Sequence, residues 1–399
     1  MNRSAPKPVE RSQEALPTEY PPLVLDKLPL SVRKILDDDG IKKLTQVQEL
    51  SYGPVRDGRD VLARSETGSG KTLAFCLPMA DFYEKNRGKR SHEAAPTVLI
   101  LCPTRELCQQ VARVFARYLK PFKKKVGVLV GGESYDRQAR FIRFGIDVIV
   151  GTPGRVTDFL QKQDMTLSCL DYFILDEVDQ MLEIGFEEQL NYIHYRIRRK
   201  VQTLFFSATL NRKAKKLAQK FLSQPFDISL AEQQLPAGLI HGVTCLKQKN
   251  RYPALLSVFN KENPQSALIF CETRADCLQL KERLLGDDYR VSVIHGDLEQ
   301  KDRQIALNHF RHGRVDILIA TNVLARGIDV DELPLVINYS MPKSVRDYTH
   351  RAGRTARAGK SGTVWTLISP KEISGFKDIC HIAGIKLKSL KGSRLEPDE

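Results

Sequence analysis

The sequence predicts an α/β protein in which two domains share one architecture, a parallel sheet flanked by helices. A chain of 399 residues has the length expected of two or three domains. Short runs rich in Val, Ile, Leu and Phe alternate with longer amphipathic segments, which is the pattern of buried parallel strands joined by helices. The pattern occurs in two successive series, so the chain repeats one architecture.

The first series supplies the elements of the first predicted domain. Its helices include 106–118 and 213–221, where apolar residues recur at helical spacing. Its predicted strands are 60–63, 97–101, 126–130, 147–150, 172–175 and 203–206.

The second series predicts a second sheet of the same kind. Its strands are 267–270, 291–294, 316–319, 336–338 and 363–368. Between the two series, Gln233, Pro236 and Gly238 interrupt the periodic pattern as a linker does. We therefore expect an N-terminal tail at 1–24, a first domain at 25–230, a linker at 231–242, a second domain at 243–390 and a C-terminal tail at 391–399.

Composition excludes several classes of protein. Hydrophobic residues make up 42% of the chain, which is enough for real cores and excludes wholesale disorder. No apolar run approaches the roughly 18 residues of a membrane span, and the N-terminal residues lack the apolar core of a signal peptide. We therefore expect neither a membrane partner nor secretion. The 62 Lys and Arg residues against 48 Asp and Glu give a net charge of +14, which either attracts anionic partners or is solvated surface.

The eight cysteines are scattered along the chain, and none forms a Cys-x-x-Cys pair. Most of them lie in apolar runs, which favours reduced, buried thiols in an intracellular protein. Disulfides or a zinc site are the alternatives.

A glycine-rich loop follows the first predicted strand and precedes a helix-compatible segment at 73–77. Its glycines allow close backbone approach to phosphate, Lys71 reaches the terminal phosphates, and Thr72 offers a hydroxyl to Mg²⁺. Ser65 stands where such loops usually begin with Gly. A linker turn beside a chance lysine is the alternative. The loop comprises Ser65, Glu66, Thr67, Gly68, Ser69, Gly70, Lys71 and Thr72.

Two carboxylates, Asp176 and Glu177, directly follow the predicted strand 172–175. The first can hold Mg²⁺, while the second can orient and deprotonate an attacking water. Taken alone, such a pair is also typical of a solvated loop. Together with Lys71 and Thr72, it predicts a site that hydrolyses a nucleoside triphosphate.

From about residue 25 to 390, a series of motifs in order resembles the DEAD-box ATP-dependent RNA helicase family. Within that family, residues 176–182, 269–273 and 320–323 resemble the nucleolar RNA helicase II (Gu) branch and its plant organelle relatives. The blocks are 40–48, 65–72, 103–107, 131–132, 152–155, 176–179, 207–209, 267–273, 295–297, 320–322, 325–329 and 350–357.

The resemblance implies two RecA-like domains with ATP, Mg²⁺ and RNA bound across their cleft. It assigns adenine contacts to Gln48 and Thr45, and a ribose contact to Asp329. It makes Arg354 and Arg357 arginine fingers on the γ-phosphate. The second half has no phosphate loop of its own, so these arginines make sense if ATP on the first half recruits them. A solvated basic loop is the alternative.

The resemblance also implies an RNA surface that contacts backbone and 2′-OH groups without sequence preference. Basic clusters at 123–125, 196–200 and 212–216 either extend it or are solvated faces. A further set couples ATP state to RNA binding, namely Asp179, Ser207, Thr209 and His350, although Ser207 or Thr209 could simply cap the next helix. The implied RNA-binding residues are Pro103, Thr104, Arg105, Gly131, Gly132, Thr152 and Arg155 in the first domain and Arg274, His295, Gly296, Thr321, Arg326 and Gly327 in the second.

The chain departs from the family pattern at several positions. Leu25 stands where an aromatic residue usually stacks on adenine, so we expect that stacking to be lost, and the block at 44–48 lacks the customary prolines. Val178, Asn322 and Ala356 replace other usual residues without removing a catalytic group.

The region after Leu390 is too short for the extra C-terminal RNA-binding domain of the Gu branch. We therefore expect a protein partner to supply the RNA target. We also expect a monomer located in the nucleus, nucleolus or cytoplasm, with an organelle left open.

The predicted function is an RNA-stimulated ATPase that locally unwinds short RNA duplexes or remodels RNA–protein complexes. Two alternatives remain at this point. One is an ATP-gated RNA clamp that acts as an assembly platform with little unwinding, and the other is a DNA helicase.

Overall fold

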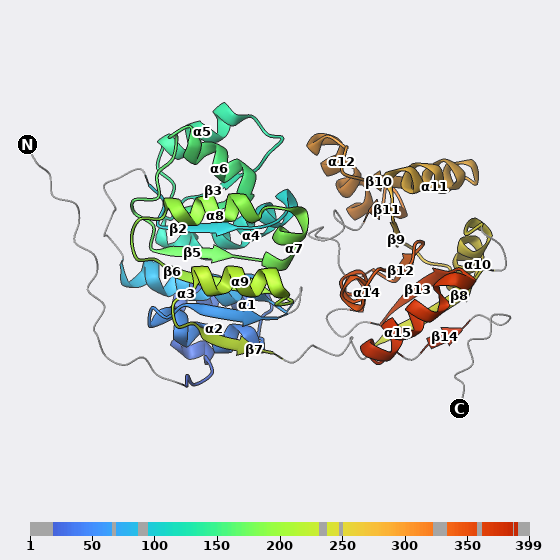
Figure 1. Cartoon of the computed structure of the whole chain (residues 1–399), viewed down its shortest axis with the longest axis horizontal. Coiled ribbons are helices and arrows are strands. Elements are labelled where there is room, and N and C mark those ends of the chain that lie inside the picture. The colour runs from blue at the N-terminus through green and yellow to red at the C-terminus, as the bar shows by residue number, and fades with distance from the viewer. Residues whose placement is uncertain are drawn as a thin grey trace, which may run out of the picture. The chain divides into compact units, whose positions relative to one another are not determined.

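The computed structural model describes residues 19–65, 69–86, 95–230, 238–246, 250–321, 333–356, 361–385 and 387–389. The chain forms two compact units, residues 1–231 and 232–399. Each unit is built around a seven-stranded sheet whose paired strands are all parallel (Figure 1). The predicted fold class is therefore confirmed.

The first sheet has the strand order β3-β4-β2-β5-β6-β1-β7. Every strand predicted for this domain is present within one residue at each end, whereas β7 was not predicted. The strands are β1 Val61–Arg64, β2 Val98–Leu101, β3 Val126–Leu129, β4 Val148–Gly151, β5 Tyr172–Leu175, β6 Gln202–Ser207 and β7 Phe226–Ser229.

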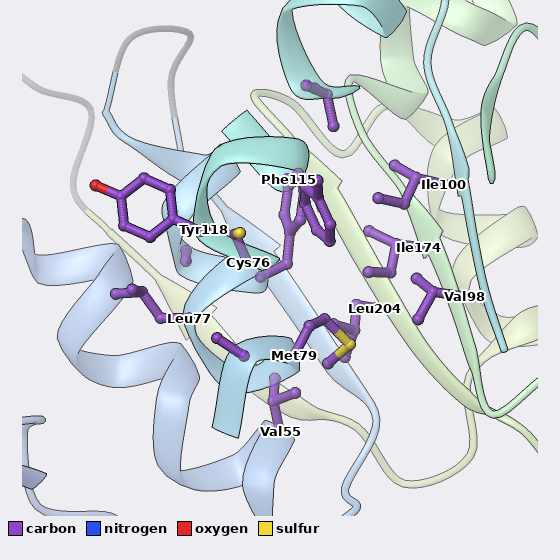
Figure 2. Close-up of a cluster of buried hydrophobic side chains, with 14 of the residues drawn as sticks. Val55, Cys76, Leu77, Met79, Val98, Ile100, Phe115, Tyr118, Ile174 and Leu204 are labelled. Atoms are coloured by element: carbon purple, nitrogen blue, oxygen red, sulfur yellow. The ribbon is translucent and has the colours of Figure 1, made fainter. Parts of the chain in front are cut away.

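Helices cover both faces of the first sheet, since alternate residues of each strand bury toward opposite sides. In β2, Val98 and Ile100 face one core and Leu99 and Leu101 face the other. Figure 2 shows the first of these cores, where Val98 and Ile100 lie near Phe115. That face is covered by α1 Leu30–Asp38, α2 Gln46–Arg56, α3 Lys71–Lys85 and α4 Arg105–Leu119, and the other by α5 Tyr135–Arg143, α6 Pro153–Gln161, α7 Val178–Ile184, α8 Glu187–Arg196 and α9 Arg212–Phe221.

The second sheet has the order β10-β11-β9-β12-β13-β8-β14, which is the order of the first sheet with each strand replaced by its counterpart. Its strands are β8 Leu239–Cys245, β9 Ala267–Cys271, β10 Val291–Ile294, β11 Ile317–Thr321, β12 Leu335–Asn338, β13 Gly362–Ile368 and β14 Leu387–Ser389. Its described helices are α10 Tyr252–Glu262, α11 Arg274–Gly286, α12 Gln300–Arg311, α14 Val345–Ala352 and α15 Ile373–Ala383.

The predicted linker at 231–242 is wrong at its C-terminal end, because β8 begins at Leu239. Gly242, the last residue of the predicted linker, lies inside this strand against the ring of Trp365, where a Cβ would overlap the indole. The glycine therefore allows close approach of a large core side chain. Residues 231–237 lie outside the described residues.

The predicted N-terminal tail at 1–24 is also too long. Leu23 is buried in the first-domain core, and its amide donates to the Glu49 carbonyl. The Tyr20 ring packs edge-on against Phe226, with 5.2 Å between the ring centroids. Residues 1–18 and 391–399 lie outside the described part of the chain.

The cysteines fit the prediction of reduced, mostly buried thiols. All eight lie within the described residues and all are free, and only Cys245 is half-buried instead of buried. In the described parts of the chain, no helix combines the length and the apolar character that a membrane span requires.

Candidate active site

The glycine-rich loop lies between β1 and α3, as predicted. Gly70 precedes the helix with a left-handed backbone (φ 89°), and a Cβ there would overlap the side-chain amide of Gln48. A glycine is therefore required on two grounds. Ser65 hydrogen-bonds to Ser69 through their hydroxyls, which are 2.6 Å apart, so the residue that replaces the usual first glycine ties the two ends of the loop together. Glu66, Thr67 and Gly68 lie outside the described residues.

Gln48 connects this loop to α2. Its Nε2 donates to the Gly70 carbonyl at 3.0 Å, and its Oε1 accepts from the Thr45 amide at 2.9 Å. Thr45 and Gln48 form a capping box at the start of α2, which satisfies backbone donors that a helix leaves free. The two residues assigned to adenine thus meet the phosphate loop directly. Leu25, at the position of the missing aromatic residue, packs against the first-domain core.

Lys71 and Asp176 come together in a buried setting. Lys71 Nζ is 4.0 Å from Asp176 Oδ1, and each side chain is no more than 5% exposed. Neither atom forms a hydrogen bond with any residue that the structure describes. A buried cation and a buried carboxylate with unused hydrogen-bonding capacity form a site that can accept a ligand with both anionic oxygens and a metal ion.

Burial raises the pKa of Asp176 to about 6, with Lys71 acting against the shift and Glu177 adding to it. A carboxyl group in this state gains strongly from a nearby cation, because the cation stabilises the charged form. A bound cation would therefore lower the pKa of Asp176 again.

Glu177 is buried and has a left-handed backbone (φ 53°) at the start of α7. This conformation is unfavourable for residues other than glycine, and such residues concentrate at functional sites. The turn separates Glu177 from the regular helix, so that Asp176 ends the strand region and Val178 begins α7.

Three of the four predicted coupling residues meet beneath this turn. Asp179 Oδ2 accepts from the amide and the hydroxyl of Thr209 at 2.8 and 3.0 Å. Ser207 Oγ donates to the Thr209 carbonyl and accepts from the Asp179 amide. The alternative role as a helix cap is wrong, because Asn211 caps α9 through its side chain. His350 belongs to the other unit.

The predicted RNA-binding residues of the first domain lie at the carboxyl ends of three adjacent strands, β3, β4 and β2. Thr104 caps α4 by accepting from the Leu107 amide, and the Arg105 guanidinium occupies the space where a Cβ of Gly132 would lie. The Thr152 amide donates to the Leu129 carbonyl, which fixes the end of β4 beside β3. The members of this edge are Pro103, Thr104, Arg105, Gly131, Gly132, Thr152 and Arg155.

The second domain places its predicted RNA-binding residues at the counterpart edge, at the ends of β10, β11 and β9. Thr273 caps α11, so Arg274 begins this helix as Arg105 begins α4. Arg274 pairs with Asp297, and His295 and Thr321 are placed by β10 and β11. Burial, with Arg274 nearby, lowers the pKa of His295. Gly296 follows His295, while Arg326, Gly327 and Asp329 lie outside the described residues.

Arg354 is buried just beyond α14, the helix that holds His350. Arg351, which lies in the predicted block 350–357 without a role assigned to it, fixes this helix. Its guanidinium donates to both carboxylate oxygens of Asp347, to Asn338 Oδ1 and to the Ser340 carbonyl. The spacing of four residues between Asp347 and Arg351 is a signal for such an ion pair on one helix face. Arg357 lies outside the described residues.

Comparison with known proteins agrees with this arrangement. Residues 45–217 match the DEAD/DEAH box helicase family, and residues 248–359 match the helicase conserved C-terminal domain. The chain is 36% identical over 392 residues to the human ATP-dependent RNA helicase DDX50, which covers 94% of this chain and 52% of the relative. It is 33% identical over 383 residues to DEAD-box ATP-dependent RNA helicase 20 of Arabidopsis thaliana, covering 95% and 74%.

The fold is similar to a solved structure of S. cerevisiae Dbp5 bound to RNA and ADP BeF3. The TM-score is 0.80 at 28% identity, and the match covers 91% of this chain and 94% of that one. Each unit therefore has the RecA-like fold that the sequence predicted. The chain spans about half the length of the human relative.

Proposed function

We propose that this chain, which belongs to the DEAD-box helicase family, is an ATP-dependent RNA helicase that locally unwinds short RNA duplexes or remodels RNA–protein complexes. The similarity to human DDX50 supports the predicted placement beside the RNA helicase II (Gu) branch.

The observation that supports this proposal best is the buried pair of Lys71 and Asp176, whose facing atoms have no hydrogen-bond partner among the described residues. The pair lies at the start of α3, where free amides and the helix dipole favour phosphate. Mg²⁺ would stabilise the charged form of Asp176, whose pKa burial raises in its absence. These residues fit a nucleotide with its metal ion.

The roles of the first-domain residues follow from this setting. Lys71 and the loop amides bind the phosphates, and Gln48 and Thr45 contact adenine. Thr72 and Asp176 would hold Mg²⁺, which supplies charge neutralisation on the phosphate oxygens. Glu177 orients the attacking water and accepts its proton. Glu66, Thr67 and Gly68, which the resemblance places in the same loop, are proposed to contribute to phosphate binding.

The second domain supplies the groups that complete hydrolysis. Arg354 and Arg357 stabilise the charge that develops on the γ-phosphate, and Asp329 contacts the ribose. ATP then binds to both domains and closes them. The Asp179, Ser207 and Thr209 network, together with His350, makes closure depend on the state of the nucleotide.

RNA binds along the counterpart edges of the two sheets. Both edges present backbone amides, threonine hydroxyls and an arginine at a helix start, which suit phosphate and 2′-OH groups and do not distinguish bases. Domain closure on one strand leaves a bend that a duplex cannot follow. Because such contacts give no sequence preference, a protein partner selects the target, and the chain acts on it as a monomer.

The test uses the purified chain, with phosphate release measured with and without single-stranded RNA, and strand separation of a short RNA duplex measured in parallel. We expect RNA to stimulate release and duplexes to separate when ATP is present. Absence of RNA-stimulated release would contradict an enzyme, and release without strand separation would indicate an ATP-gated clamp. Equal stimulation by DNA of the same sequence would indicate a DNA helicase.

A further inference from the structure

Tyr135, the first residue of α5, lies against α6. Its ring stacks on Phe159, with 4.2 Å between the centroids and 8° between the planes. Its hydroxyl donates to Asp164 Oδ2 at 2.7 Å. Burial and Asp164 raise the pKa of Tyr135, so the side chain is a neutral hydrogen-bond donor. The ring is thus fixed on one face and at its tip.

Two cations lie over the same ring. The Arg155 guanidinium is 5.8 Å from the ring centroid, and Lys162 Nζ is 4.0 Å from it. A cation over an aromatic face is attracted by the ring quadrupole. We call Tyr135, Phe159, Arg155 and Lys162 the Tyr135 clasp.

The clasp reaches the glycine loop that follows β3. Arg155 Nη1 donates to the Glu133 carbonyl at 3.2 Å, and only 12% of the Arg155 side chain is exposed. Arg155 Nε lies 3.6 Å from Asp158, one helical turn along α6. The Arg155 guanidinium therefore contacts the loop through the Glu133 carbonyl and also faces the Tyr135 ring.

A second arginine, Arg105 at the start of α4, lies next to the same loop. Gly132 has a left-handed backbone (φ 73°), and a Cβ there would overlap the Arg105 guanidinium. The loop 131–134 is thus held between Arg105 and Arg155. The two arginines thus restrict the conformation in which the loop presents its backbone amides.

We propose that Tyr135 is a positioning residue for RNA binding, which acts by holding Arg155 against the loop 131–134. The proposal rests on the proposed function of this edge as an RNA surface. Loss of the ring releases Arg155 and lets the loop move, which weakens phosphate contacts. The ATP site at Lys71 and Asp176 lies at the ends of other strands and is unaffected.

The experiment compares Tyr135→Leu with Tyr135→Phe in the full chain. We expect Tyr135→Leu to raise the KM for single-stranded RNA in phosphate release about tenfold, with kcat at saturating RNA and KM for ATP within twofold of wild type. Tyr135→Phe keeps the stacked ring and both cation contacts, so it restores the KM for RNA to within about twofold of wild type. Tyr195→Leu is the control, because Tyr195 on α8 is 76% exposed.

A further readout separates positioning from folding. If Arg155 and the loop lose their contacts with RNA, the dependence of log Kd on log salt concentration becomes shallower by about 0.7 in Tyr135→Leu. The proposal is overturned if Tyr135→Leu leaves the KM for RNA unchanged, if Tyr135→Phe is equally impaired, or if kcat and Tm fall with an unchanged salt slope. A wild-type chain without RNA stimulation contradicts the proposed function instead.

Discussion

The two domains have the same strand order, but they carry different residues where the first domain has its proposed hydrolysis site. In the first domain, β1 leads into the glycine-rich loop and Lys71. In the second domain, the counterpart strand β8 leads toward Arg251, just before α10. Arg251 donates to both Glu372 oxygens at 2.8 Å and to the carbonyls of Tyr339 and Leu367. An ion pair thus lies between β8 and α10, the elements whose counterparts in the first domain flank the proposed phosphate loop.

A second pair of strands differs in the same way. Strand β5 is followed by Asp176 and Glu177, whereas its counterpart β12 is followed by Tyr339 and Ser340. The edges formed by β2 and β9 are alike, since each continues into a threonine cap and an arginine. The fold therefore supplies equivalent positions in both domains, and under the proposed function the residues at those positions restrict ATP hydrolysis to the first domain.

The sharpest test of this division is Glu177→Gln. If hydrolysis depends on the first domain's carboxylate, the substitution lowers RNA-stimulated phosphate release about 10³-fold, because the attacking water loses its base. ATP binding, measured with a fluorescent ATP analogue, stays within about threefold. Glu183→Gln, at an exposed position on the same helix, is the control and retains activity. Unchanged phosphate release in Glu177→Gln would show that Glu177 is not the base.

The next test asks whether the second domain contributes to the same reaction. Arg354→Ala should lower kcat about 10²-fold, as expected on removing one charged donor from a developing oxyanion. Arg354→Ala should have little effect on ATP binding to the open form, that is, before the two domains close on the nucleotide. Arg314→Ala, at an exposed position of the same domain, serves as the control. Equal losses in hydrolysis and ATP binding would contradict a finger role.

A third test concerns the ion pair between Arg251 and Glu372 in the second domain. Arg251→Met leaves Glu372 and two carbonyls without their donor and should lower the free energy of unfolding of the second domain by about 2 kcal/mol. Trp365, the only tryptophan of the chain, is buried in this domain, and its fluorescence during urea unfolding measures the change.

The matched control for Arg251 is Arg290→Met. Arg290 pairs with Asp316 on the surface, and exposed pairs contribute little to stability. If Arg251→Met and Arg290→Met lower the free energy of unfolding of the second domain equally, the Arg251–Glu372 pair contributes no more than an exposed ion pair.

The smallest expected effect concerns how the stability of the second domain depends on pH. His241 Nδ1 is 2.6 Å from the Tyr348 hydroxyl in the second core, and burial lowers the pKa of His241 to about 4. The unfolded chain binds a proton near pH 6.5, whereas the folded chain does not, so stability is present above that pH and falls toward pH 4. We expect a loss of about 1 kcal/mol between pH 6.5 and 5.5.

The same Trp365 fluorescence measures this dependence. His241→Gln should flatten the pH profile of second-domain unfolding, while His381→Gln, at an exposed position on α15, should not. Parallel profiles for wild type and His241→Gln would show that another group is responsible.

The strands were largely predictable, because runs such as Tyr172–Leu175 are apolar throughout and bury on both faces. Strand β7 was missed because Phe226–Ser229 lies at the sheet edge and exposes alternate residues. The start of β8 is hidden in the sequence because Pro236 and Gly238 interrupt the pattern just before it, and the close contact of Gly242 with Trp365 is visible only in the structure. Single-sequence patterns do not contain such pairings between distant residues.

The candidate site was predictable where one motif contains its own chemistry, as with Lys71, Asp176 and Glu177. The sequence did not indicate the roles of Arg251, Arg351 or Tyr135, whose partners come from other strands and helices. Their contacts arise from topology, which brings separate segments to one edge of the sheet.

The left-handed backbone at Glu177 has a consequence for the evolution and engineering of this chain. Glycine at this position would relieve roughly 1 kcal/mol of conformational energy, since it adopts positive φ without a steric penalty. The same change would remove the carboxylate. If Glu177 is the base as proposed, selection for thermal stability alone would favour variants without turnover, and stability and activity would compete at this position.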